Sequence, residues 1–328
     1  MTQPIIPKRR IGVSDLEVGV VGVGTWQWGD LAYWGGRNQS EPTDVSAAYA
    51  ASMSRGANLL DTAEIYGSGK SERRIGELRA GDARPAVVAS KYFPVPTRWQ
   101  LREVDAAIDG SLNRLGAECI DLYQVHWPMS VISHRRLLRR LAGAVHDGRI
   151  RYIGVSNFTA RQMYRAHAVL AHEGVSLVSN QVSYSLLRRA PEVNGVLEAC
   201  HDLGVTLIAY SPVGQGILTG KYGPAAQLPR KRRLARLVGG PTLERAMPVI
   251  EALRRIGLAM GITASQAAIA WTRRDSVVLP IVGERTAAQA ESNADAAAVT
   301  LDQEAIRELD AVSSAYCTAG RIARRFMG

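Results

Sequence analysis

The chain has 328 residues, 46% of them hydrophobic, and its 40 basic and 30 acidic side chains leave a formal net charge of +10. No apolar run approaches the 18 residues of a membrane span, and the first ten residues lack the apolar core of a signal peptide. Three scattered cysteines, in no Cys-x-x-Cys spacing, favour a reduced cytoplasmic protein over a disulfide framework or a metal site. The densest basic run, Arg230–Arg233 with Arg236, has no interleaved aromatic residues, so no nucleic-acid partner is predicted.

The first predicted elements are a hairpin and a strand. Two apolar pairs flank Ser14 and Asp15, a pattern typical of a short β-hairpin over 9–19. An apolar strand follows over 20–24, and a helix is predicted over 44–55, where the apolar side chains share one face.

From residue 58 onward, apolar strands alternate with amphipathic helices. Further strands are predicted over 58–61, 86–91, 120–126, 152–156, 177–181, 205–210 and 277–282. Helices are predicted over 71–79, 101–115, 133–146, 160–172, 190–203, 242–260, 263–273, 286–296 and 302–315. Eight strands in all follow the hairpin, and strands separated by helices form a parallel sheet. The sequence therefore predicts a (β/α)8 TIM barrel with an N-terminal β-hairpin, as a single domain over 1–328.

Functional residues of such a barrel lie where its strands end. The side chains at these positions include Trp26, Asp61, Tyr66, Lys91, His126, Ser156, Asn157, Gln181 and Tyr210. Each of them alone is more often a packing or surface residue. Three consecutive strands, however, bring Asp61, Lys91 and His126 to one end of the barrel, with Tyr66 on the loop after Asp61.

These four residue types suit carbonyl reduction. The Tyr66 hydroxyl, with a usual pKa of about 10, can donate a proton, and a nearby ammonium is expected to lower that pKa. Asp61 would keep a dehydrated Lys91 charged, and His126 would orient a substrate oxygen. The oxygen would receive a proton while its carbon receives a hydride. No side chain supplies hydride, so a nicotinamide cofactor is predicted.

Seven motifs occur in the order and spacing of one known family. They are Asn58-Leu-Leu-Asp-Thr-Ala-Glu-Ile-Tyr-Gly67, Ala89-Ser-Lys91, Asp121-Leu-Tyr-Gln-Val-His126, Gly154-Val-Ser-Asn-Phe158, Ser179-Asn-Gln181, Tyr210-Ser-Pro212 and Pro280-Ile-Val-Gly283. With them the chain resembles the aldo-keto reductase superfamily over nearly its whole length, and its bacterial and plant pyridoxal-reductase-like members most of all. The resemblance implies NADPH-dependent reduction of an aldehyde or ketone, with Asp61, Tyr66, Lys91 and His126 as the catalytic tetrad.

The resemblance also implies a binding site for NADPH or NADP+. Ser156, Asn157 and Gln181 would hold the nicotinamide carboxamide, and Tyr210 would stack on the ring. Arg285 is expected to meet the 2′-phosphate of NADP. The other implied cofactor positions are Gly24, Thr25, Asp61, Ser211, Val213, Gln215, Gly216, Leu218, Gly283, Gln289 and Asn293. The carboxylate that commonly precedes this Asn in the family is replaced by Ser292.

The predicted substrate is a small carbonyl compound, bound without a metal. Aromatic residues beside the tetrad are expected to form an apolar wall: Trp26, Tyr92, Phe93 and Trp127. Trp28, Tyr33 and Trp34 on the loop 27–39 are further candidates to close over the pocket. The tail after residue 316 either leaves the pocket open or folds over it.

Two alternatives remain open at this point. The chain would be a nicotinamide-bound regulatory subunit if it resembled the channel-associated β-subunits of the superfamily, although the complete tetrad favours catalysis. A barrel hydrolase or isomerase using Asp61, His126 and Glu64 would need a metal cluster or a phosphate site, and the nicotinamide-type residues argue against it. The physiological substrate, the direction of reaction and the oligomeric state are not predicted.

Overall fold

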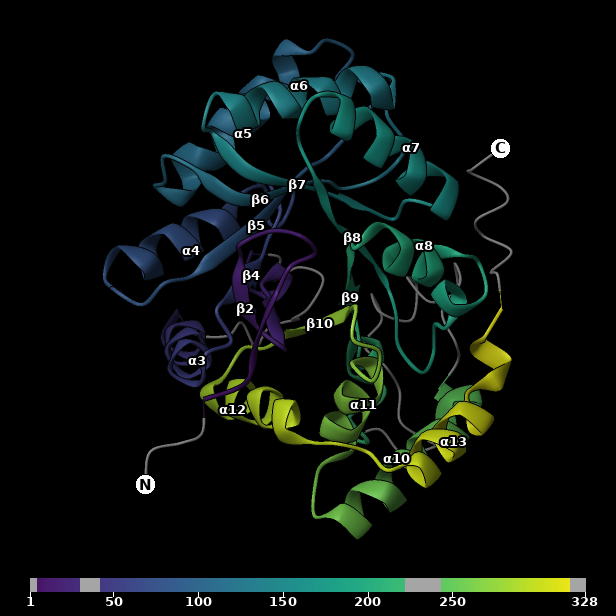
Figure 1. Ribbon diagram of the computed structural model, residues 1–328. Coiled ribbons are helices and arrows are strands. Elements are labelled where there is room, and N and C mark those ends of the chain that lie inside the picture. Colours follow the sequence, from purple (N-terminus) through teal and green to yellow (C-terminus); the bar gives the residue numbers. More distant parts are fainter. Residues whose placement is uncertain (1–4, 30–41, 222–242, 319–328) are drawn as a thin grey trace.

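A closed parallel barrel forms the centre of the computed structural model, which describes residues 5–29, 42–221 and 243–318 (Figure 1). Its eight strands are hydrogen-bonded in the order β10-β3-β4-β5-β6-β7-β8-β9. They are β3 (Gly22–Gly24), β4 (Leu59–Asp61), β5 (Val87–Tyr92), β6 (Ile120–Val125), β7 (Ile150–Ser156), β8 (Leu177–Ser183), β9 (Thr206–Tyr210) and β10 (Val278–Gly283). The predicted (β/α)8 barrel is therefore confirmed.

Helices surround the barrel (Figure 1). They are α1 (Trp26–Gly29), α3 (Pro42–Arg55), α4 (Lys70–Ala80), α5 (Arg102–Leu115), α6 (His134–His146), α7 (Ala160–His172), α8 (Val196–Leu203), α10 (Leu243–Met260), α11 (Ala264–Thr272), α12 (Ala287–Asp295) and α13 (Gln303–Val312). Single 3-10 turns lie at η1 (Ala190–Glu192), η2 (Gly214–Gly216), η3 (Ala296–Ala298) and η4 (Ser314–Tyr316). Among the described helices, none combines the length and the apolar character needed to cross a membrane.

One predicted helix was wrong in extent, and one short helix was not predicted. The helix predicted over 190–203 is divided into η1 and α8, because Gly195 has a φ of +80° that no α-helix accommodates. The short helix α1 was not predicted, since Trp26 was assigned only to the end of a strand. The predictions for Tyr33, Trp34 and the basic run 230–236 lie outside the described residues.

The predicted N-terminal hairpin is present, and it closes one end of the barrel. Its strands β1 (Lys8–Arg10) and β2 (Glu17–Gly19) pair antiparallel, and Figure 1 shows them in purple across this end. Three buried hairpin side chains pack with the inward apolar side chains of the barrel: Ile11, Leu16 and Val18. At the bend, a Cβ on Gly12 would lie 2.5 Å from the carbonyl oxygen of Val178, so only glycine permits this close seat. The hairpin therefore covers this end of the barrel, opposite the carboxyl ends of the strands.

Alternation along β5 sorts side chains between two environments. Val87 and Ala89 pack inside the barrel, and Lys91 follows them on the same inward side. Ser90 and Tyr92 point outward, where Tyr92 packs in the core between sheet and helices. The barrel interior thus changes from apolar near the hairpin to polar at the carboxyl ends of the strands.

Candidate active site

A buried ion pair lies at the centre of the candidate active site. Lys91 is fully buried and Asp61 is 2% exposed, and Lys91 Nζ lies 2.7 Å from Asp61 Oδ2. The ammonium also donates to the carbonyl oxygen of Thr62 at 2.6 Å and to the Tyr66 hydroxyl at 3.3 Å. Burial lowers the pKa of Lys91, and the Asp61 carboxylate opposes that change. The ammonium therefore has three oxygen partners, one of which is the phenol of Tyr66.

The second oxygen of Asp61 is held by two amides. Gln181 Nε2 donates to Asp61 Oδ1 at 2.7 Å, and Gln124 Nε2 approaches the same atom at 3.4 Å. Both carboxylate oxygens are thus engaged, which fixes the plane of the group that faces Lys91. Sequence reasoning missed Gln124. The available signal was its position two residues before His126. In the structure, Gln124 on β6 pairs in register with Lys91 on β5.

Tyr66 is half-buried on the loop between β4 and α4 and lines the cavity. Burial, and then the negative charge of Asp61, raise the pKa of Tyr66 well above its usual value. The net change is opposite to the lowering expected from a nearby ammonium, because burial of the phenol is its largest cause. A phenol that keeps its proton at neutral pH is suited to donate one.

Close backbone packing holds the Tyr66 loop in place. Gly67 has a φ of +58°, and a Cβ there would lie 2.1 Å from the carbonyl oxygen of Gly29. The loop and α1 therefore touch with no side chain between them. The same contact brings Trp26, on α1, into a stack on Tyr66, with ring centroids 5.8 Å apart and an angle of 24° between planes.

His126 follows β6 and faces Tyr66 edge-on, with ring centroids 5.8 Å apart. Its Nδ1 atom is buried and has no hydrogen-bond partner in the described residues. Burial, with the charge of Lys91 adding to it, lowers the pKa of His126 to about 2. The imidazole is consequently neutral at neutral and at mildly acidic pH.

A cavity of about 840 Å³ extends from Tyr66 and His126 along the carboxyl ends of the strands. Most of the predicted cofactor residues line it: Gly24, Asp61, Ser156, Asn157, Gln181, Tyr210, Ser211, Val213, Gln215, Gly216, Gly283, Arg285, Gln289 and Asn293. Thr25 and Leu218 do not line it, because both are completely buried, and the Thr25 hydroxyl donates to the carbonyl oxygen of Asp61. Lining residues that were not predicted include Gln27, Ile65, Thr219 and Lys221.

Polar side chains on β7, β8 and β9 hold one another at one part of this cavity. Asn157 has a φ of +62°, and its Nδ2 donates to the carbonyl oxygen of His126 at 3.1 Å. Its Oδ1 accepts the hydroxyl of Tyr210 at 3.1 Å, while Ser156 Oγ donates to the carbonyl oxygen of Gln181 at 2.9 Å. The Tyr210 ring is therefore fixed in the cavity wall beside the tetrad.

The loop after β9 is a tight turn with several left-handed residues. Positive φ angles occur at Ser211 (+57°), Gly214 (+58°), Gln215 (+54°) and Gly216 (+88°). Main-chain hydrogen bonds hold this turn, in which the N–H groups of Gly214 and Gly216 donate to the carbonyl oxygens of Ser211 at 2.9 Å and Val213 at 3.0 Å. The side chains of Lys221 and Arg285 line the same cavity and add positive charge.

The predicted aromatic wall is only partly present. Trp26 and Trp127 line the cavity. The prediction for Tyr92 was wrong: because Lys91 points inward, Tyr92 points outward, is fully buried, and has the Arg98 guanidinium 5.2 Å from its ring centre. Phe93 packs its ring on His126, with centroids 5.3 Å apart, and does not line the cavity.

Two other candidates have structural contacts instead. Trp28 is buried, with Nε1 donating to the carbonyl oxygen of Glu284 at 2.8 Å, so it does not close over the pocket. Glu64 pairs with Arg98 at 2.5 Å and accepts the main-chain N–H of Phe93 at 2.6 Å. Within the described residues, no group of three or more His, Cys, Asp or Glu side chains is arranged to hold a metal ion.

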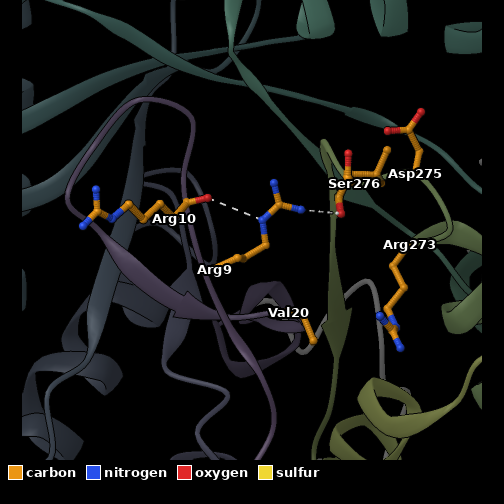
Figure 2. Close-up of a pocket in the computed structure, with 7 residues that line it drawn as sticks. Arg9, Arg10, Val20, Arg273, Asp275 and Ser276 are labelled. Carbon is orange, nitrogen blue, oxygen red and sulfur yellow. Dashed lines mark hydrogen bonds between the residues drawn. The ribbon is translucent and has the colours of Figure 1, made fainter.

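A smaller cavity of about 360 Å³ lies at the hairpin end of the barrel (Figure 2). It is lined by Arg9, Arg10, Val20, Arg273, Asp275, Ser276 and Val278. Arg9 donates to the carbonyl oxygens of Val278 at 3.0 Å and Arg10 at 3.4 Å. Arg273 donates to the carbonyl oxygens of Ala297 at 2.6 Å and Val299 at 2.9 Å. These guanidinium groups tie main-chain segments together.

The chain is similar to known proteins over most of its length. The model of the Aldo/keto reductase family matches residues 20–314. The chain is 33% identical to the chloroplastic pyridoxal reductase of Arabidopsis thaliana over 300 residues, 88% of this chain and 81% of that protein. It superposes on glycerol dehydrogenase from Gluconobacter oxydans with a TM-score of 0.83 and 26% identity, covering 98% and 99% of the two chains. An aldo-keto reductase from Klebsiella pneumoniae in complex with NADPH gives 0.76 and 25%, covering 97% and 98%.

Proposed function

The chain belongs to the aldo/keto reductase family, and we propose that it reduces an aldehyde or ketone to an alcohol with NADPH as the hydride donor. One observation carries the proposal. The Tyr66 hydroxyl, 3.3 Å from Lys91 Nζ and beside the neutral His126, lines a cavity that continues along the loop after β9 to Arg285. A candidate proton donor and a candidate nucleotide site therefore line the same cavity.

The residues of the cavity fit a nicotinamide dinucleotide phosphate. The ring of Tyr210 offers a stacking face, and the amides and hydroxyls beside it match the donors and acceptors of a carboxamide. The loop after β9 would hold the pyrophosphate, and Arg285 would meet the 2′-phosphate. The NADPH complex of the Klebsiella pneumoniae relative supports this choice of cofactor. When bound, the cofactor supplies the hydride.

The side chains of the tetrad would then orient and protonate the carbonyl oxygen of the substrate. The neutral His126 would donate a hydrogen bond to the carbonyl oxygen and orient it. Tyr66 would give its proton to that oxygen as negative charge develops there. The Lys91 ammonium, held by Asp61, would stabilise the resulting phenolate. The aromatic rings of Trp26 and Trp127 would exclude water from the carbonyl carbon.

The proposal predicts a clear result for Tyr66→Phe. Removing a general acid costs about 10² to 10⁴ in rate, so we expect turnover on a carbonyl panel, including pyridoxal, to fall by at least about 100-fold. The dissociation constant for NADPH, measured by protein fluorescence, should change less than about twofold because the phenol is not required to bind the cofactor. Unchanged turnover would remove Tyr66 from this role.

The same experiment separates the alternative of a regulatory subunit. Such a protein would bind NADPH yet turn over no carbonyl compound on the panel, and Tyr66→Phe would then have no activity to remove. Failure to bind either NADPH or NADH would contradict both readings. We further propose a cytoplasmic location, because all three cysteines are free thiols.

A further inference from the structure

Glu284 is a buried carboxylate that the proposed reaction does not use. It follows the last residue of β10 and lies between Gly283 and Arg285, which both line the large cavity. Its own side chain is only 2% exposed and extends toward α3 and α12, away from that cavity. A buried ionisable group is costly unless its hydrogen bonds are satisfied, so its contacts are informative.

Only neutral groups hold this carboxylate among the described residues. Oε1 accepts the hydroxyl of Ser52 on α3, and Oε2 accepts Nδ2 of Asn293 on α12 at 3.2 Å. No described cationic side chain forms an ion pair with it. Burial accordingly raises the pKa of Glu284 to about 7, against the hydrogen bonds that favour its charged form.

The carboxylate determines which way the Asn293 amide is turned. An ionised carboxylate accepts hydrogen bonds and donates none, so the amide must present its NH₂ group to Glu284. The carbonyl oxygen Oδ1 is then the atom left for the cavity that Asn293 lines, and no described hydrogen bond engages it. Without the carboxylate, either the NH₂ group or the carbonyl oxygen of Asn293 could point toward position 284.

A second amide supplies the opposite polarity. Gln289, which also lines the cavity, uses its Oε1 to accept the main-chain N–H of Arg285 at 2.9 Å. Its NH₂ group is therefore the part that remains to donate. One acceptor from Asn293 and one donor from Gln289 match adenine, which donates from its 6-amino group and accepts at its ring nitrogens.

We propose that Glu284 is a positioning residue for base recognition: it fixes the Asn293 amide with its carbonyl oxygen toward the cavity, so that the site selects a purine with a 6-amino group. This inference rests on the proposed function, because it concerns the adenosine end of the same dinucleotide site.

The test compares NADPH with its hypoxanthine analogue, in which a 6-oxo group replaces the amino group. Dissociation constants of both are measured by protein fluorescence for the wild type, Glu284→Gln and Asn293→Ala. We expect the wild type to bind NADPH about tenfold more tightly than the analogue, from one lost hydrogen bond and one oxygen left unpaired. In both variants the ratio should fall to within about twofold of unity. An unchanged ratio in Glu284→Gln refutes the proposal.

The control is Glu291→Gln, which removes the same charge from α12 at a half-exposed position. It should change both dissociation constants by one factor and leave their ratio as in the wild type. A ratio lost in this control as well would mean that charge, not amide orientation, carries the selectivity. If neither ligand binds the wild type, the proposed function itself fails, and that result is distinct from an unchanged ratio.

A pH series adds a readout that a purely structural role would not move. The wild-type ratio should be larger at pH 8 than at pH 6, and that of Glu284→Gln should be flat. Protonation of the 2′-phosphate cancels, because both ligands have it. Other charged groups on the elements around Glu284 are Asp44, Arg55, Arg285, Glu291 and Asp295, of which Arg55 and Asp295 pair with each other. A flat wild-type ratio would contradict the proposal.

Discussion

Neutralising Glu284 should change how the stability of the free protein depends on pH. Burial raises the pKa of this carboxyl from its ordinary 4.5 to about 7 in the folded state. The folded protein therefore holds a proton that the unfolded chain releases. The corresponding stability is fully present below pH 4.5 and is lost as the pH rises through 7.

The size of the loss follows from the two pKa values. At about 1.4 kcal/mol per pKa unit, the carboxylate costs about 3 kcal/mol of folding free energy at pH 8. For a chain of this length, the unfolding entropy of about 2.1 cal/mol/K per residue converts this to about 4 °C in Tm. Glu284→Gln keeps the shape and can still form both hydrogen bonds, because the Asn293 amide can turn over.

The assay is thermal unfolding without cofactor at pH 5 and pH 8. The two proteins differ only at this side chain, so the comparison is the difference in Tm between variant and wild type at each pH. That difference should shift by about 4 °C in favour of Glu284→Gln on going from pH 5 to pH 8. For the half-exposed Glu291→Gln it should stay constant within about 1 °C. A constant difference for Glu284→Gln would show that the carboxyl is not buried as described.

Two further substitutions test the loop contacts and the cofactor end. Arg285→Ala should weaken NADPH binding by about tenfold or more, the value of a hydrogen bond to a charged group, and alter NADH binding less than about twofold; equal losses would rule out a contact with the 2′-phosphate. Gly67→Ala should lower the unfolding free energy by about 2 kcal/mol or more and reduce turnover further, since its Cβ would overlap the Gly29 carbonyl. The control is Gly81→Ala, where nothing lies within 4 Å; equal effects at both glycines would refute the role of the contact.

Strand order and the ends of the strands could be predicted from the sequence. Eight apolar runs that end in polar residues recur along the chain, and this repeat predicts the strands and their ends. Closure of the barrel then fixes which strands are neighbours. Asp61 and Lys91 were therefore expected to meet, and they lie 2.7 Å apart. The catalytic roles of the tetrad stay predictions.

Side-chain direction was harder to predict than position. Tyr92 was assigned to the pocket because it adjoins Lys91, although adjacent residues in a strand face opposite sides. Gln124 and Glu284 were missed for a related reason, since their partners lie far away in sequence. The pKa of Tyr66 was misjudged because sequence indicates a charge nearby but not the extent of burial. These properties depend on the packed interior and not on local pattern.

The contact between Gly29 and Gly67 has a consequence for any attempt to redesign the pocket. The main chains of the segment that bears Tyr66 and the segment that bears Trp26 touch, and the two rings stack on each other. We therefore expect that a change which loosens either segment also displaces the Tyr66 side chain. New substrate scope is better sought by exchanging side chains at Ile65 or Trp127, which line the cavity and are partly exposed.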